Sequence, residues 1–128
     1  MANETVTVTQ VTPAVTVSAV AGHTLQAGGD INGPLNLIGA AGAAGILTIS
    51  TEELTVVDGN ELGRINFQAP LESSGTDAIL VAASIYAEAD DTFDATTNDT
   101  DLVFATGLSE TATEKMRLLS GGILQLGT

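Results

Sequence analysis

The side chains that could do chemistry are mostly carboxylates, and five of them lie in one Thr- and Asn-rich stretch: Asp90, Asp91, Asp94, Asp99 and Asp101. Oxygen ligands of this kind suit Ca²⁺, and the spacing begins like an EF-hand loop. However, Ala95 stands where that loop requires glycine, and Asp101 replaces its bidentate glutamate. We therefore expect a solvated loop held by side-chain to backbone turns, with a looser cation site at a subunit interface as the alternative.

Candidate catalytic residues are scarce. The chain has no cysteine, which excludes thiol nucleophiles and disulfides, and His23 is its single histidine. A Ser–His–Asp arrangement would have to use His23 with an unidentified serine, so a solvated turn histidine is the favoured interpretation. Paired carboxylates could cleave sugars, but few aromatic residues are present to support a sugar ring. We expect a protein that is not an enzyme and that carries no cofactor and no bound metal.

Three basic residues stand among 16 acidic ones: Arg64, Lys115 and Arg117. All three fall within β-rich runs rather than in loops. One interpretation is that Arg64 and Arg117 pair with carboxylates of a neighbouring chain and fix the register between subunits. The alternative is an ordinary outward-facing charge that contributes under about 1 kcal/mol.

Composition favours a self-associating protein. The 128 residues carry a net charge of −13, which disfavours binding to nucleic acids and to anionic membranes. Apolar residues make up 44% of the chain, but aromatic residues only 3%. This apolar content is too high for a disordered acidic chain, yet it is poor in the large side chains that fill a monomeric core. We therefore expect burial between identical subunits.

The elements that must position these residues are short strands. Period-two alternation of β-branched residues predicts strands between Thr5 and Ser18, interrupted at Pro13, followed by a Gly/Ala-rich connector. Further strands are predicted at 46–49, 54–57, 64–67, 83–88, 102–105, 116–119 and 123–126. Turns are predicted at Asp58-Gly59 and at Ser120-Gly121-Gly122, with a helical turn as an alternative near 77–83. The prediction is an all-β chain of roughly eight or nine strands. It divides into an N-terminal β/attachment segment (1–21), a connector (22–45) and a β domain (46–128).

Five motifs in this second part occur in the order seen in shaft modules of tailed-bacteriophage fibres and spikes. They are Gly63-Arg64-Ile65-Asn66-Phe67, Ala83 to Ala89, Leu102-Val103-Phe104-Ala105-Thr106, Glu114-Lys115-Met116-Arg117-Leu118 and Gly122 to Gly127. The sequence resembles these modules over about residues 45–128. The resemblance implies a homotrimer of interwoven β-strands, with the N-terminal segment attached to a major capsid protein or another virion protein.

Because the chain stops at Thr128, which leaves no room for the chaperone domain or receptor-binding head that follows in many relatives, we expect a short capsid decoration (cement) protein or head spike on the capsid exterior, made in the host cytoplasm. The alternative is a tail-fibre segment for receptor binding or fibre assembly, for which Tyr86 and Phe93 are the candidate contact residues. A spike that cleaves carbohydrates is a third hypothesis. The residues expected to form the trimer core are Ile65, Phe67, Ile85, Leu102, Phe104, Met116 and Leu118.

Overall fold

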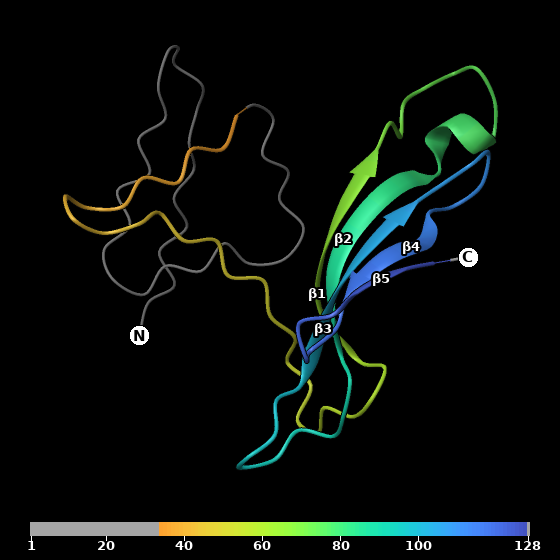
Figure 1. Cartoon of the computed structure of the whole chain (residues 1–128). Coiled ribbons are helices and arrows are strands. Elements are labelled where there is room, and N and C mark those ends of the chain that lie inside the picture. Colours follow the sequence, from red (N-terminus) through yellow and green to blue (C-terminus); the bar gives the residue numbers. More distant parts are fainter. Residues whose placement is uncertain (1–33, 128) are drawn as a thin grey trace, which may run out of the picture. The chain divides into compact units, whose positions relative to one another are not determined.

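The computed structural model describes residues 34–127, most of which belong to one compact unit, Ile38–Thr128. Within it, five strands form a single antiparallel sheet (Figure 1). The strands are β1 (Glu61–Gln68), β2 (Val81–Ala89), β3 (Thr100–Thr106), β4 (Thr113–Leu118) and β5 (Leu124–Leu126). The described residues contain no α-helix, only a short 3₁₀ turn, η1 (Asp77–Ile79), and none of their helices could cross a membrane.

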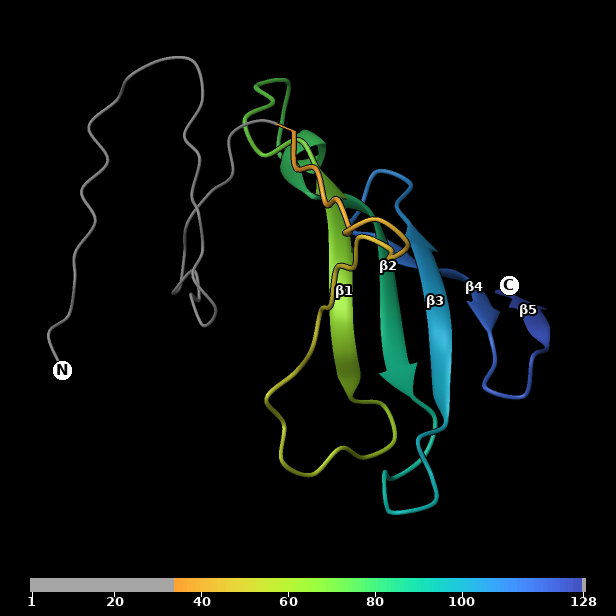
Figure 2. The ribbon, with the colours of Figure 1, turned by 90° about the vertical axis from the view of Figure 1, so that its left-hand side faces the viewer.

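Each strand pairs with the next along the chain, so the sheet order is β1-β2-β3-β4-β5. Figure 2 shows β1, β2 and β3 side by side, with the β4–β5 hairpin beyond β3. The turn of that hairpin is closed by a hydrogen bond from the Gly122 amide to the Leu119 carbonyl, and Gly122 has a φ of +80°, which glycine adopts at little cost. The predicted Ser-Gly-Gly turn is therefore confirmed.

The prediction of an all-β chain is confirmed for the described residues, but two of its strands are wrong. Residues 46–49 and 54–57 are in neither a strand nor a helix. A strand requires a neighbour for its backbone groups, and none of the described residues forms a ladder with these two runs. The turn at Asp58-Gly59 is present, with Gly59 at φ +81°, but it leads into β1 rather than joining two paired strands.

Two predictions concern residues that lie wholly or mostly outside the described ones. The strands expected between Thr5 and Ser18, and with them the attachment segment 1–21, are outside, as is the connector up to residue 33. The predicted boundaries of the three segments therefore stay predictions.

The strand register sorts side chains onto two different faces, because directly opposed residues of antiparallel strands share a face. One row across the sheet is entirely apolar: Ile65, Ile85, Phe104, Met116 and Leu126. The adjacent row belongs to the opposite face and is mostly polar: Arg64, Tyr86, Val103, Arg117 and Gln125. We call these the apolar face and the charged face.

The most deeply buried side chains lie mainly on the charged face. Val103 is fully buried between its cross-strand neighbours Tyr86 and Arg117, whose long side chains present apolar parts beside it and polar ends to water. Ser84 and Asp101 are also buried there. The apolar face, in contrast, remains largely open in the single chain.

Candidate functional site

The open apolar face is the main candidate for function. The strand register places all seven residues of the expected trimer core on it: Ile65, Phe67, Ile85, Leu102, Phe104, Met116 and Leu118. Leu124 and Leu126 extend the same face across β5. Six of these nine side chains are exposed, from 39% at Leu102 to 70% at Leu126, whereas Ile85, Phe104 and Met116 are partly buried. An exposed apolar face of this kind is typical of an interaction site.

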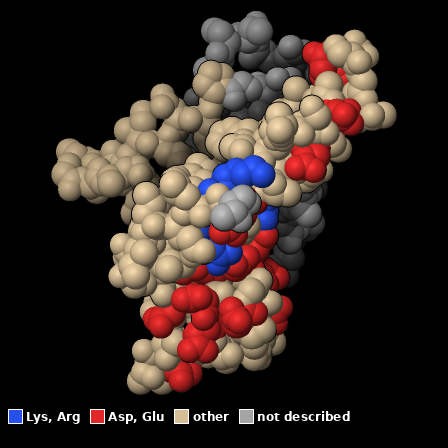
Figure 3. Space-filling model, turned by 45° about the vertical axis from the view of Figure 1, so that its right-hand side comes forward, with Lys and Arg blue, Asp and Glu red and all other residues tan. Residues whose placement is uncertain are grey.

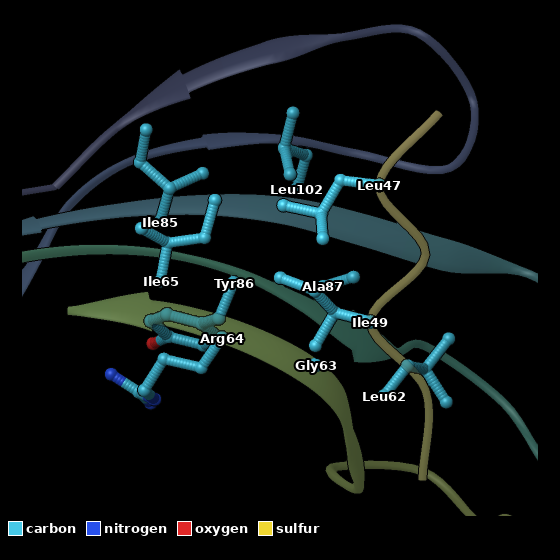
Figure 4. A pocket seen from close by; sticks show the side chains of 10 residues that line it. All are labelled: Leu47, Ile49, Leu62, Gly63, Arg64, Ile65, Ile85, Tyr86, Ala87 and Leu102. Atoms are coloured by element: carbon cyan, nitrogen blue, oxygen red, sulfur yellow. The ribbon is translucent and has the colours of Figure 1, made fainter. Parts of the chain in front are cut away.

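A hollow of about 420 Å³ opens on this face over the start of β1 (Figure 4). Leu47 and Ile49 form one wall, while Ile65, Ile85 and Leu102 lie opposite them. The hollow is apolar, since the Arg64 and Tyr86 side chains point to the other face of the sheet in Figure 4. It offers space for an apolar group and no charged group that could do chemistry.

Gly63 allows the 46–49 segment to approach the sheet. A Cβ atom at this position would lie 2.7 Å from Cγ2 and 3.0 Å from the carbonyl oxygen of Ile49. Gly63 is opposite Ala87, so the added atom would project from the apolar face. Any larger residue would therefore push Ile49 away from the sheet.

The charged face is organised around Arg117. Its guanidinium forms ion pairs with three carboxylates, at 2.7 Å to Glu88, 2.8 Å to Asp101 and 2.8 Å to Glu114. Figure 3 shows the basic side chains gathered in one patch, with acidic side chains around it and toward the end of the sheet that carries the 90–99 loop. The pairs hold β2, β3 and β4 together within one chain.

Arg64 makes a second, smaller cluster. It pairs with Glu61, donates a 2.8 Å hydrogen bond from Nη1 to Oγ of Ser84, and lies 3.9 Å above the centre of the Tyr86 ring. This cation–π contact covers the ring that was a candidate for receptor contact. The partners of Arg64 and Arg117 described here all belong to the same chain, and pairing with a neighbouring subunit stays a prediction.

Two β-bulges bring Glu61 to Arg64 and Glu114 to Arg117. Residues three apart in a regular strand point to opposite faces, so Glu61 and Arg64, or Glu114 and Arg117, would be separated. The register skips Leu62 in β1 and Lys115 in β4, and each extra residue turns the glutamate to the face of its arginine. The Glu-x-x-Arg spacing was visible in the sequence, but the bulges that make it an ion pair were not.

The ion pairs shift the pKa values of the paired side chains. The hydrogen bond from Arg117 lowers the pKa of Glu114, and the hydrogen bond from Arg64 lowers the pKa of Glu61. Hydrogen bonds to Glu114 and Asp101 in turn raise the pKa of Arg117. Burial raises the pKa of Tyr86, and the nearby carboxylates of Glu88 and Glu114 add to this.

The acidic 90–101 stretch is a hydrogen-bonded loop. Oδ1 of Asp94 accepts hydrogen bonds from the amides of Thr96 and Thr97, which also lower the pKa of the Asp94 carboxyl. No group of three ligating side chains suited to a metal ion occurs among residues 34–127. Phe93 is half-buried in the loop, and His23 lies outside the described residues. The predicted turns are present, and the geometry offers no assembled cation site within this part of the chain.

No family model, no curated protein and no solved structure matches the chain. The resemblance to phage fibre modules therefore rests on the five sequence motifs alone and stays a prediction.

Proposed function

We propose that the protein is a non-enzymatic structural protein of a phage virion that acts as a homotrimer, either as a capsid decoration protein or as a head spike. The observation that supports this is the open apolar face, to which all seven expected core residues contribute. Burial of such a face is the main favourable contribution to subunit association. The sequence resemblance supports three copies rather than two and suggests the virion as the location.

Charge favours a second copy of this chain as the partner for this face. A chain of net charge −13 repels its own copies wherever acidic surfaces meet. The central rows of the apolar face contain no charged residue, whereas Arg64, Glu88, Asp101, Glu114 and Arg117 project from the opposite face. Copies can therefore meet through the apolar face without bringing like charges together.

The exposed side chains of the apolar face supply the contact that the proposal requires. A specific interface buries roughly 800 Å² on each partner, and six large apolar side chains of this face are 39–70% exposed. In the assembled particle, we propose that residues 1–21 attach the trimer to a major capsid protein or another virion protein. The acidic outer surface then keeps particles soluble and mutually repelling.

Sedimentation of the full chain tests the trimer. One chain has a mass of 12.9 kDa, so sedimentation equilibrium should give a mass of about 39 kDa, three times that of one chain, for a trimer. Phe67→Asp should give folded monomers, because it places a charge in the expected trimer contact at a side chain that is 51% exposed in the single chain. Leu108→Asp, in the exposed β3–β4 loop, adds the same charge and should remain trimeric. A folded wild-type monomer at micromolar concentration contradicts the proposal.

Copy number on purified particles separates the two virion locations. Hundreds of chains per particle support a decoration protein, and a few dozen or fewer support the tail-fibre alternative. Quantitative protein gels measure this directly.

A further inference from the structure

Residues 46–49 have the composition of a strand but no strand beside them. Ile46-Leu47-Thr48-Ile49 alternates in the period-two pattern that is typical of strands, yet its backbone groups make no hydrogen bond to the backbone of any described residue. The segment is nevertheless held in place. Leu47 and Ile49 face the sheet and line the hollow, although they are still 58% and 44% exposed, and Ile46 is 75% exposed.

β1 presents the complementary feature. It is the edge strand of the sheet, eight residues long, and only its β2 side is paired within the described chain. It contains no proline, and residues 65–68 are exposed. An edge of this length is a template for pairing with another strand. The opposite edge, β5, has only three residues and offers much less.

We infer that residues 46–49 of one copy add as a strand to the open edge of β1 in the next copy. This inference rests on the proposed trimer and names the contact that closes it. In this arrangement the side chains of Leu47 and Ile49 stay on their own sheet, and the Ile49 carbonyl oxygen stays beside Gly63, while the remaining backbone groups of the segment pair with the next copy. The contact is head-to-tail, and such contacts form closed rings when the rotation between copies closes.

Charge is compatible with this pairing. The segment has no charged residue, and the two charged residues of β1, Glu61 and Arg64, neutralise each other. The acidic excess of the chain therefore does not oppose the contact. Main-chain hydrogen bonds would provide the affinity, as in other cases of β-strand addition, and the neighbouring apolar face would add burial.

Engineered cysteines test the inference cleanly, because the chain has no cysteine of its own. Full-length Thr48→Cys protein is mixed with an equal amount of Ile65→Cys or Asn66→Cys protein, which place the thiol on either face of β1. The mixture is dissociated, reassembled and mildly oxidised. We expect a disulfide-linked pair containing one chain of each variant, seen by mass spectrometry, with at least one β1 position. Ser73→Cys, in the exposed loop after β1, is the matched control and should give at most a tenth of that yield.

The outcomes separate this inference from the proposed function. Trimers that link through Thr48 and β1 support both. Trimers in which neither β1 position links above the Ser73 control overturn the strand addition and leave the trimer standing. A chain that stays monomeric and does not link overturns both.

Discussion

Arg117 donates a 2.8 Å hydrogen bond from Nη1 to Oδ2 of Asp101, a carboxylate that is only 1% exposed. The other oxygen of Asp101 accepts a 2.8 Å hydrogen bond from the amide of Ser120 in the β4–β5 turn. A carboxylate so well shielded from water requires these partners, since an unpaired buried charge is strongly destabilising. The pair therefore connects β3 to β4 and to the hairpin that follows.

Loss of Arg117 should destabilise the chain far more than loss of another base. Arg117→Met leaves Asp101 buried with one hydrogen bond, and we expect the free energy of unfolding to fall by about 3 kcal/mol. Lys115→Met removes only a hydrogen bond to Thr113, and the free energy of unfolding should change by less than about 0.5 kcal/mol. Urea unfolding followed by circular dichroism measures both. Equal losses in the two variants would show that the Arg117 cluster has no special role.

Stability should depend on pH through the carboxylates that Arg117 and Arg64 stabilise. The folded pKa values of Glu114 and Glu61 lie below the ordinary value of 4.5, so the unfolded chain binds protons first as the pH falls. Their contribution is fully present above pH 4.5 and is lost as the pH falls through the lowered values. Urea midpoints at several pH values between 7 and 3 measure this loss.

The control for this prediction is a pair of glutamine variants. Glu114→Gln should flatten the decline below pH 4.5, because one of the shifted groups is gone. Glu110→Gln removes an exposed carboxylate that forms no ion pair with a described residue, and the decline should persist. A decline that is unchanged in Glu114→Gln would count against the assignment.

The single tyrosine should ionise above its ordinary value of 10. Burial, together with the carboxylates of Glu88 and Glu114, disfavours the phenolate of Tyr86. Because the chain has one tyrosine and no tryptophan, ultraviolet absorbance follows this group alone. Since the folded pKa is raised, the group's contribution to stability is present below pH 10 and is lost as the pH rises further. Glu88→Gln should bring the midpoint of the absorbance change closer to 10, and an upward movement would refute the assigned cause.

A methyl group at Gly63 should disturb the contact with Ile49. Gly63→Ala places a Cβ atom 2.7 Å from Cγ2 of Ile49, so the 46–49 segment must move, and we expect a loss of about 1–2 kcal/mol. Gly121→Ala is the matched control, because no atom lies within 4 Å of its added Cβ and its φ is not positive. Thermal unfolding compares the two, and a Gly63→Ala protein as stable as the control would place Ile49 elsewhere.

Local pattern was enough to predict five of the strands and the closing turn. Alternation in runs such as Ile65 to Phe67 and Leu102 to Phe104 depends only on the two-residue period of a strand, which each segment shows by itself. The same alternation, combined with the strand register of the structure, places the seven expected core residues on one face. The sequence also marked the 46–49 run as β-like, but a paired strand needs a neighbour, and none of the described residues provides one.

The sequence by itself therefore determined the strand periodicity, the turns and the acidic excess, because these follow from residues that are close along the chain. Only the tertiary structure decided which carboxylates Arg117 meets, since Glu88 and Asp101 come from other strands and Glu114 reaches it through the bulge at Lys115. It also decided that the charged face would be the better buried one. That outcome depends on long side chains covering their cross-strand neighbours, a contact between residues far apart in the sequence.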